Sequence, residues 1–309
     1  MILNTGCRTD IPAYYSEWFY NRIREGFVLT RNPYRPEQVL KYRLDPAVVD
    51  ALCFCTKNPQ PMLARLDELH AFRQFWFVTV TPYGKEIEPF VPDKARVLAS
   101  VRQLSALVGA QAIGWRYDPV FISERYSLEY HLHRFETMAA TLCGSVNSCV
   151  VSFIDLYEKT RRNFPQARAV SADEQKQLIQ AFVAIGQKYR IPIRTCCENP
   201  SLAQYGADVA GCITREVLEA ALDCRLNVPK SRKSPRAQCN CLLGADIGMY
   251  NTCPHGCVYC YANYDRRTVE RNRRLHDPQS PLLIGNLREG DSIIEVRQES
   301  YVSSQLSMF

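Results

Sequence analysis

Apolar residues follow two different spacings that alternate along the chain. Short continuous apolar runs, such as residues 49–55 and 149–154, are typical of strands buried on both faces. Between such runs, segments such as residues 93–108 place apolar side chains three or four positions apart, which predicts amphipathic helices. Strands and helices that alternate in this way indicate a parallel sheet covered by helices.

The spacing predicts elements over most of the first 250 residues. The expected strands cover residues 1–5, 49–55, 75–80, 111–115, 149–154, 191–195, 209–213 and 244–250. The expected helices cover residues 16–25, 62–69, 93–108, 128–142, 172–189 and 215–222. The strands total about eight, the number found in a (β/α) barrel. We therefore expect an α/β fold of the barrel type.

Polar side chains follow several of the expected strands, and in a barrel these strand ends converge on the face that carries the chemistry. The candidate site residues of this kind are Thr9, Asp10, Thr79, Thr81, Arg116, Asp118 and Asp155. Arg116, Asp118 and Asp155 are the catalytic candidates. Arg116 suits a carboxylate or phosphate of a substrate, and a mutual ion pair with Asp118 that shapes the loop is an equally good interpretation. Lys57 is either a cation in the cavity or an exposed loop lysine.

Length and composition set broad limits on the protein. The chain has 309 residues, 46% of them hydrophobic, which suits one large barrel or two smaller domains. No apolar run approaches the roughly 20 residues of a membrane span, and the first residues lack the pattern of a secretory signal. We expect a cytoplasmic protein without membrane contact.

Charge gives only weak information about partners. The net charge of +6 permits nucleic acid as a partner without indicating it. A run of arginines falls between residues 266 and 274. A solvated helix face is the favoured interpretation of this run, and contact with the phosphates of DNA or RNA is the alternative.

The cysteines are unusually numerous and unevenly placed. Five of the 14 fall between residues 239 and 260, which in a cytosolic chain of this length points to metal or cluster ligation. Cys253, Cys257 and Cys260 form a C-x3-C-x2-C motif, and three thiolates so close can bind three irons of a cubic cluster while the fourth iron stays open. The alternative is a structural zinc loop that takes a fourth ligand from elsewhere, with Cys239, Cys241 and His255 as the candidates.

The cysteine motif also carries a resemblance to known families. Residues 250–262 resemble the radical S-adenosylmethionine (SAM) superfamily, and most closely its spore photoproduct lyase-like branch, whose cluster loop commonly ends in the same Tyr-Cys-Tyr-Ala. Residues 9–12, 56–69 and 88–93 resemble later parts of that branch in the same order. The chain also resembles, over nearly its full length, a bacterial family of unassigned function, DUF1848.

The resemblance to radical SAM enzymes implies a reaction and its cofactors. A four-iron four-sulfur cluster on the three motif cysteines would donate one electron to SAM, whose cleavage gives methionine and a 5′-deoxyadenosyl radical. That radical would abstract hydrogen from a substrate that the sequence does not identify. The cluster would receive its electrons from a donor such as flavodoxin or ferredoxin.

The same resemblance implies roles for several residues by their position. Thr9 and Asp10 would meet the methionine amine of SAM, although the Gly-Gly-Glu triplet usual at that strand end is absent here. Tyr259 would pack near the adenine, and Thr79 and Thr81 would meet the ribose.

The order of the motifs departs from the superfamily. Radical SAM enzymes carry the cluster loop after the first barrel strand, whereas here it comes near the end of the chain. Circular permutation explains this order, with residues 244–250 as barrel strand one and residues 1–5 as strand two. The expected division is residues 1–225 for strand two onward with their helices, 226–265 for the first strand and cluster loop, and 266–309 for an extension packed on the barrel.

A second group of cysteines suggests a further metal site. Cys196, Cys212, Cys239 and Cys241 would ligate an auxiliary four-iron cluster, a choice of ligands that the resemblance to DUF1848 favours over one with Cys197. In the alternative, Cys212 is a small core residue, and Cys239 with Cys241 is a zinc or redox pair. Two other functions stay open: a non-catalytic zinc- or cluster-binding protein, and a nucleic-acid repair protein related to spore photoproduct lyase.

Overall fold

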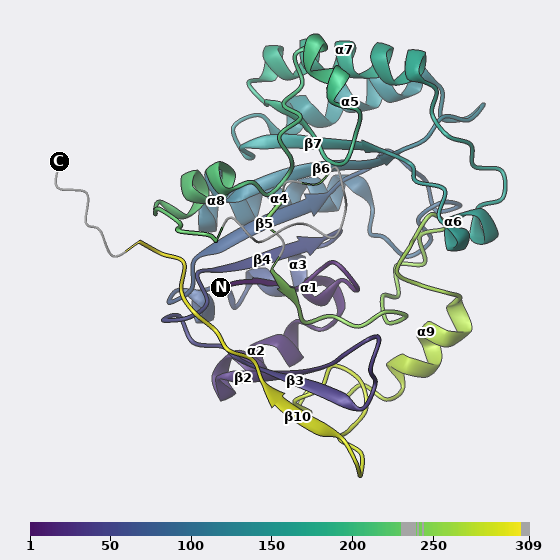
Figure 1. Cartoon of the computed structure of the whole chain (residues 1–309). Helices are drawn as coiled ribbons and strands as arrows, with labels where there is room; N and C mark the ends of the chain where they lie inside the picture. The colour runs from purple at the N-terminus through teal and green to yellow at the C-terminus, as the bar shows by residue number, and fades with distance from the viewer. Residues whose placement is uncertain (230–238, 240, 243, 304–309) are drawn as a thin grey trace, which may run out of the picture.

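The main element of the fold is a seven-stranded sheet in which every neighbouring pair is parallel. The computed structural model describes residues 1–229, 239, 241–242 and 244–303. Across the sheet the strands lie in the order β8, β7, β6, β5, β4, β1, β9 (Figure 1). Their bounds are β1 Ile2–Asn4, β4 Ala51–Thr56, β5 Gln74–Thr79, β6 Ile113–Val120, β7 Ser148–Phe153, β8 Ile193–Thr195 and β9 Ala245–Asp246.

Five helices cover one face of this sheet. They are α1 Ile11–Tyr14, α3 Gln60–Leu63, α4 Lys94–Val108, α5 Leu128–Leu142 and α7 Ala172–Tyr189. Their apolar side chains share one core with alternate residues of the strands. Phe54 of β4 stacks on Trp76 of β5 with ring centroids 4.0 Å apart, and Trp115 of β6 stacks on Phe135 of α5. Figure 1 shows α5 and α7 together beside β7, at one end of the sheet.

The opposite face of the sheet carries a second, smaller core. Here Ala51, Phe75 and Phe77 of the strands pack with Leu218 and other apolar residues of α8, which spans Arg215–Leu222. Because both faces are covered, the strands are apolar at almost every position, which explains the continuous runs in the sequence.

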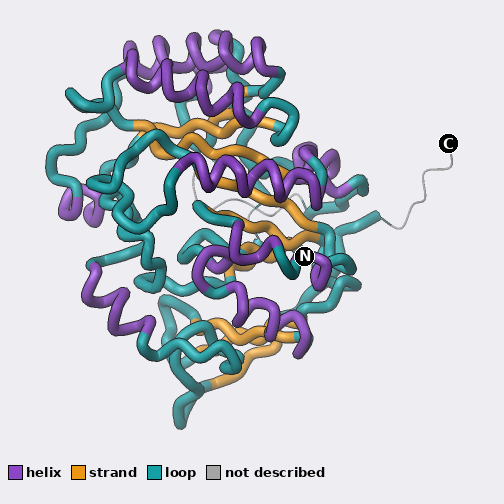
Figure 2. Tube along the Cα trace, turned by 180° about the vertical axis from the view of Figure 1, so that it is seen from behind, coloured by secondary structure: helices purple, strands orange, loops and turns teal. Residues whose placement is uncertain are grey.

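A separate three-stranded sheet joins the two ends of the chain. It consists of β2 Phe27–Arg31, β3 Gln38–Arg43 and β10 Ser292–Glu295, in the order β10, β3, β2. Figure 2 shows it below the main sheet as a distinct group of strands. Arg31 forms an ion pair with Asp291 just before β10, and the N-terminal ammonium group donates to the Glu299 carbonyl at 2.8 Å. The remaining helical segments are α2 Ser16–Glu25, η1 Leu66–Leu69, η2 Ala110–Ala112, α6 Glu158–Asn163, η3 Pro200–Tyr205 and α9 Arg266–Arg273.

The α/β class with a parallel sheet is confirmed, and four expected helices match α2, α5, α7 and α8 at both ends. The expected strand at residues 209–213 is wrong. Gly211 has a φ of +125°, outside the strand region, and the N–H groups of Cys212 and Ile213 point to the Cys241 sulfur instead of a neighbouring strand. The described residues therefore place seven strands in the main sheet.

Several elements were not expected. β2, β3, β10 and α6 all lie outside the segments singled out from the sequence, whereas α9 agrees with the helix favoured for the arginine run. The expected helix at residues 62–69 is divided into the short turns α3 and η1. Across the described segments, the structure contains no helix with the length and apolar character that a membrane crossing requires.

Candidate metal centres

The loop that carries Cys253, Cys257 and Cys260 follows β9 and begins beside the carboxyl end of β1. Leu3 of β1 pairs in parallel with Ala245 of β9. At the next residue, the Asp246 carboxylate accepts hydrogen bonds from the Cys7 amide at 2.8 Å and the Arg8 guanidinium at 2.9 Å. These contacts join the two strand ends, although about 240 residues separate them in the sequence.

The conformation of the loop is set by a glycine and by contacts with the segment after β5. Gly256 has a φ of +68°, a conformation that favours glycine, and a Cβ there would lie 3.1 Å from the Phe90 ring. The Val258 amide donates to the Ile87 carbonyl at 3.0 Å, and the Phe90 amide donates to the His255 carbonyl at 3.1 Å. The loop is thus held against the segment that follows β5 as well.

The three motif thiols lie where ionisation is costly. Burial raises the pKa of Cys253, Cys257 and Cys260, to about 12 at Cys257. The three sulfurs are close enough for their charges to oppose one another's ionisation. A bound cation removes this penalty, because metal coordination deprotonates a thiol outright. The chemistry of the donor set therefore fits a metal or an iron–sulfur cluster.

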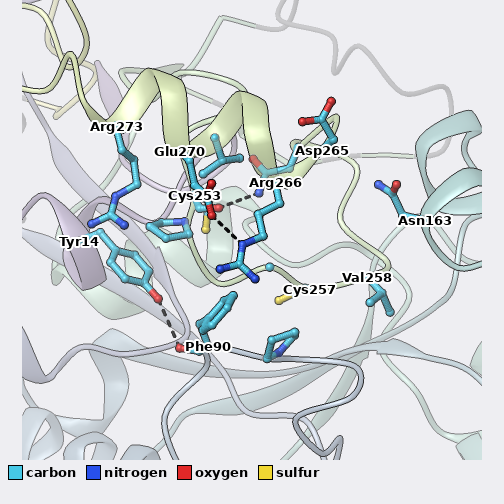
Figure 3. Close-up of a pocket in the computed structure, with 15 residues that line it drawn as sticks. Tyr14, Phe90, Asn163, Cys253, Cys257, Val258, Asp265, Arg266, Glu270 and Arg273 are labelled. Carbon is cyan, nitrogen blue, oxygen red and sulfur yellow. Dashed lines mark hydrogen bonds and ion pairs between the residues drawn. The ribbon is translucent and has the colours of Figure 1, made fainter.

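A cavity of about 520 Å³ reaches Cys253 and Cys257 from outside the loop. Tyr14, Phe90 and the α9 side chains Arg266 and Arg273 line its other sides (Figure 3). Close to the loop, two buried polar atoms have no hydrogen-bond partner among the described residues: Thr9 Oγ1 and Asn263 Oδ1. Asn263 also donates to the Cys253 carbonyl at 2.7 Å. Unsatisfied polar atoms beside buried thiols fit a site for a polar cofactor.

Asp10 holds the loop in place. Its carboxylate bonds His255 Nε2 at 2.8 Å, accepts from the Lys57 amide at 2.8 Å, and caps α1 by accepting from the Ala13 amide at 3.0 Å. His255 Nδ1 lies 3.0 Å from the Tyr14 hydroxyl. Of the two residues expected to meet the methionine amine, only Thr9 keeps a free polar atom, and this role stays a prediction.

Glu88 is the centre of a buried polar network that sequence reasoning missed. It is 1% exposed and accepts hydrogen bonds from Lys57 Nζ at 2.7 Å and Thr81 Oγ1 at 2.7 Å, and from Lys94 and the Tyr259 hydroxyl. Burial alone would raise the pKa of Glu88, but the charges and hydrogen bonds of Lys57 and Lys94 lower it to about 2. The network fastens Tyr259, and with it the loop, to the ends of β4 and β5.

Thr79 and Thr81, the two residues expected to meet the ribose, lie at and just after the end of β5. Thr81 donates to Glu88, and Thr79 is half-buried at the last position of β5. Lys57 is not an exposed loop lysine, since it bonds Glu88 and lies 5.6 Å from the Tyr259 ring centroid. The only sign of Glu88 in the sequence was its place in a segment that resembles the lyase-like branch.

Arg116 and Asp118, at the end of β6, form the ion pair that was one of the two interpretations, with an N–O distance of 2.6 Å. Burial opposes the charge of Arg116, but Asp118 and the thiols of Cys212, Cys55 and Cys196 outweigh this effect and raise its pKa. Arg116 therefore lies beside the second cysteine group as well as beside Asp118.

Two further carboxyl groups follow the neighbouring strands. Asp155, after β7, is exposed and accepts from the Tyr157 hydroxyl at 2.9 Å. Glu198, which sequence reasoning missed, follows β8 and accepts from the Phe153 amide at 2.8 Å. Burial raises the pKa of Glu198 to about 8, with a smaller contribution from Asp155. A carboxyl group with such a pKa is largely protonated at neutral pH and can donate a proton.

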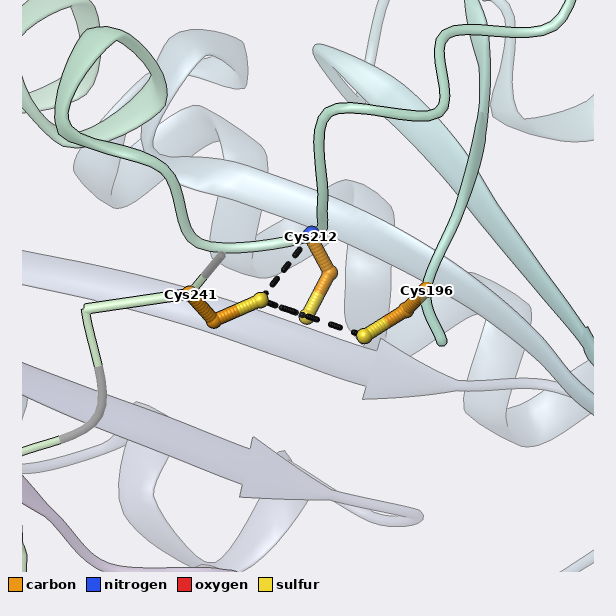
Figure 4. Close-up of side chains that lie close together, drawn as sticks. All are labelled: Cys196, Cys212 and Cys241. Atoms are coloured by element: carbon orange, nitrogen blue, oxygen red, sulfur yellow. Dashed lines mark hydrogen bonds between the residues drawn. The ribbon is translucent and has the colours of Figure 1, made fainter. Parts of the chain in front are cut away.

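The second cysteine group gathers five thiols in two overlapping sets. One set is Cys196, Cys212 and Cys241 (Figure 4), and the other is Cys196, Cys197 and Cys239. The Sγ–Sγ distances are 3.3 Å from Cys212 to Cys241, 3.9 Å from Cys196 to Cys241 and 4.0 Å from Cys196 to Cys197. All four expected ligands thus belong to this group, and Cys197 is an additional member.

Backbone groups around Cys241 stabilise its thiolate. The Cys212 and Ile213 amides direct their N–H groups at Cys241 Sγ over 3.2 and 3.4 Å. Hydrogen bonds from the Cys196 and Cys212 thiols, the largest contributions, lower the pKa of Cys241 to about 4. A Cβ at Gly211 would lie 3.3 Å from this sulfur, so a glycine with positive φ lets the chain pass around it.

The spacing of these sulfurs indicates what the group can bind. Four thiolates around a tetrahedral zinc ion, at Zn–S distances of about 2.3 Å, lie about 3.8 Å apart. The separations of 3.9 and 4.0 Å are close to this value and that of 3.3 Å is shorter, and five thiols also offer enough ligands for an iron–sulfur cluster. The group is a candidate metal centre of either kind.

Comparison with known protein families identifies the family of this chain. The family described as "Domain of unknown function (DUF1848)" matches residues 2–262, and the chain belongs to this family. The matched segment includes all seven strands of the main sheet, both cysteine groups and the Glu88 network, and it ends before α9. Among curated proteins, no match to the chain was found.

The Glu88 network gives a prediction about stability and pH. Replacing Glu88 with Gln leaves two lysines without their buried counter-charge, and we expect the free energy of unfolding at neutral pH to fall by about 3–5 kcal/mol. The folded pKa of about 2 lies below the ordinary value of 4.5, so ionised Glu88 contributes stability above that value and loses it as the pH falls toward 2.

Urea unfolding of both proteins between neutral pH and pH 2 measures this difference, which should narrow below about pH 4.5. The matched control is Glu295→Gln, which removes an exposed partner of Lys41 and should leave stability nearly unchanged. A gap between Glu88→Gln and the unchanged protein that stays constant down to pH 2 would contradict the assignment.

The second cysteine group predicts a metal that depends on Cys212 and Cys241. In a Cys212→Ala/Cys241→Ala variant, the anaerobically purified protein should lose either about four irons with their sulfide or one zinc. Iron, zinc and acid-labile sulfide analysis measures this loss. Cys149→Ala is the control, since Cys149 is also fully buried but belongs to neither set. Equal metal content in all three proteins would show that the group is not a metal centre.

Proposed function

We propose that this protein is a radical SAM enzyme whose four-iron cluster is bound by Cys253, Cys257 and Cys260, built on a circularly permuted (β/α) barrel. The observation that carries the proposal is the parallel pairing of β9 with β1. β9, the strand before the cysteine loop, lies at the edge of the sheet next to β1, although it is the last strand of this sheet in the sequence. This is the arrangement that permutation of a radical SAM barrel requires.

The winding of the sheet supports a barrel over a doubly wound fold. A doubly wound sheet reverses its strand order at a switch point and places helices on both faces. Here the order from β1 to β8 follows the sequence without reversal, and the helices α1, α3, α4, α5 and α7 between these strands share one core on one face, whereas α8, which follows β8, packs on the other. Right-handed connections that all run in one direction produce this arrangement, as they do in barrels.

The chain's own residues support the role of the cysteine loop. When bound, a cluster of this kind supplies one electron to the sulfonium of SAM, which breaks into methionine and a carbon radical that takes a hydrogen atom from substrate. The three thiols are half-buried, and Glu88 and Asp10 hold the loop in position. Thr9 Oγ1 and Asn263 Oδ1 are the polar atoms free to contact the cofactors.

The residues at the ends of β6 and β8 are the candidates for substrate contact. Arg116 pairs with Asp118 and interacts electrostatically with Cys196 and Cys212 of the second cysteine group and with Tyr261 of the cysteine loop, and Glu198 interacts with Asp118 and Cys196. A substrate held there would meet a permanent cation and a carboxyl group that can exchange a proton. Asp155 is exposed and has a weaker claim to this role.

A non-catalytic metal-binding protein is the second candidate. The observation that favours it is the Sγ spacing in the second cysteine group, where the distances of 3.9 Å from Cys196 to Cys241 and 4.0 Å from Cys196 to Cys197 are close to those around a single zinc ion. A structural zinc in that group is compatible with a radical SAM centre in the other. Zinc without sulfide in the whole protein would make the non-catalytic function the better one.

The reaction itself can be tested without knowing the substrate. Anaerobic protein reconstituted with iron and sulfide, then mixed with SAM and dithionite, should form 5′-deoxyadenosine and methionine. In a Cys253→Ala/Cys257→Ala/Cys260→Ala variant the yield should fall by more than about a hundredfold, because even residues behind metal ligands affect activity 10- to 100-fold. Chromatography of the products measures this yield.

The control is Cys143→Ala, which removes an exposed cysteine far from both groups in the sequence and should leave the yield unchanged. Equal yields from the triple variant and the unchanged protein would exclude the proposed role of the loop.

A further inference from the structure

We propose that the exposed arginine surface of α9 is the docking site for a small acidic one-electron carrier protein that reduces the cluster. We define this surface by Arg266, Arg267, Arg271, Arg273 and Arg274, all of which are exposed. The inference rests on the proposed function, which requires an electron from outside the chain. It concerns a segment that lies beyond the residues matched by the family.

The positive charge of this surface is largely uncompensated. Within the described part of the chain, Arg267, Arg271 and Arg274 form no ion pair, and Arg266 pairs with Glu270 at 2.7 Å. α9 has eight residues and is therefore about 12 Å long, so five arginines are concentrated on one short element. A concentrated charge of one sign attracts a partner of the opposite sign and speeds its association.

The surface lies directly over the approach to the cluster cysteines. Arg266 and Arg273 line the cavity that reaches Cys253 and Cys257, and Figure 3 shows both side chains directed from α9 toward Phe90 and Tyr14. The Arg266 guanidinium lies 5.0 Å from the centre of the Phe90 ring, and Phe90 is 47% exposed. A partner seated on α9 would thus contact the outer side of the cysteine loop itself.

A protein fits this surface better than nucleic acid does. Interfaces between proteins combine an exposed aromatic residue and arginine with a small apolar floor, here formed by Phe90, Val258 and Val269. Single-stranded nucleic acid needs a basic groove that follows the backbone with aromatic residues along it. The arginines here lie along about 12 Å of one helix instead, and two of them, Arg266 and Arg273, line the cavity.

The electron balance of the step is simple. The reduced carrier loses one electron and returns to its oxidised form, and the cluster gains that electron. No proton or group is transferred between the two proteins. The chain's contribution is to hold the carrier with its redox centre close to Cys253 and Cys257.

The test is the rate at which reduced flavodoxin, as the probe carrier, reduces the cluster in an anaerobic stopped-flow experiment. In an Arg267→Glu/Arg271→Glu/Arg274→Glu variant this rate should fall about tenfold or more at low ionic strength, and the rate of the unchanged protein should fall as salt is added. The milder Arg267→Gln/Arg271→Gln/Arg274→Gln variant should lie in between. Reduction by dithionite, which needs no docking, should be equal in all of them.

The control variant reverses three exposed charges elsewhere, as Arg96→Glu/Arg102→Glu/Lys176→Glu on α4 and α7. It changes the net charge by the same amount, so a similar loss of rate would show a general charge effect and overturn the docking site. Equal rates for the α9 variants and the unchanged protein would also overturn it. If those variants instead lose only salt-dependent binding to a DNA duplex, the surface binds nucleic acid and the proposal is wrong.

The dithionite experiment separates the two proposals. If dithionite reduces the cluster in every variant, the proposed function stands, whatever the result with flavodoxin. A protein with no visible cluster absorbance for dithionite to bleach would refute the proposed function, and the docking proposal with it.

Discussion

The parallel pairing of β9 with β1 is the interaction on which the arrangement of the site depends. Two hydrogen bonds that the Asp246 carboxylate accepts from Cys7 and Arg8 join the end of β9 to the residues after β1. Gly244, just before β9, approaches so closely that a Cβ there would lie 1.9 Å from the Ile2 carbonyl oxygen. The cysteine loop that follows is then held at two further points, by Asp10 after β1 and by Glu88 after β5.

Burial is the second constraint that unites the site. Thiols, carboxylates and lysines are all withdrawn from water around the loop, and each buried charge has a partner: Glu88 has two lysines, and Asp10 has His255 and two backbone amides. At the motif thiols burial outweighs the hydrogen bonds and positive charges that favour ionisation, and it raises the pKa of each. A cation bound by these thiols would complete the charge balance of the site, which is why we regard the loop as a cofactor site and not as a part of the core.

Local sequence patterns predicted the helices whose formation depends on their own residues. The periodicity of residues 128–142 and 172–189 marks helices that match at both ends, since each buries one apolar stripe. β10 was not foreseen because its residues are all exposed and it forms only by pairing with β3, more than 250 residues away in the sequence. The cysteines were found by spacing, whereas Glu88 and Glu198 were not chosen as site residues and Cys197 was set aside in favour of Cys196, because the importance of all three depends on neighbours brought together by the fold.

The central claim is that the cluster on Cys253, Cys257 and Cys260 keeps one iron open for SAM, and electron paramagnetic resonance of the reduced protein tests it most directly. The account predicts a four-iron cluster signal that is absent from the Cys253→Ala/Cys257→Ala/Cys260→Ala variant and whose g values shift when SAM is added. A cluster signal that SAM leaves unchanged, or that survives loss of the three cysteines, would contradict it.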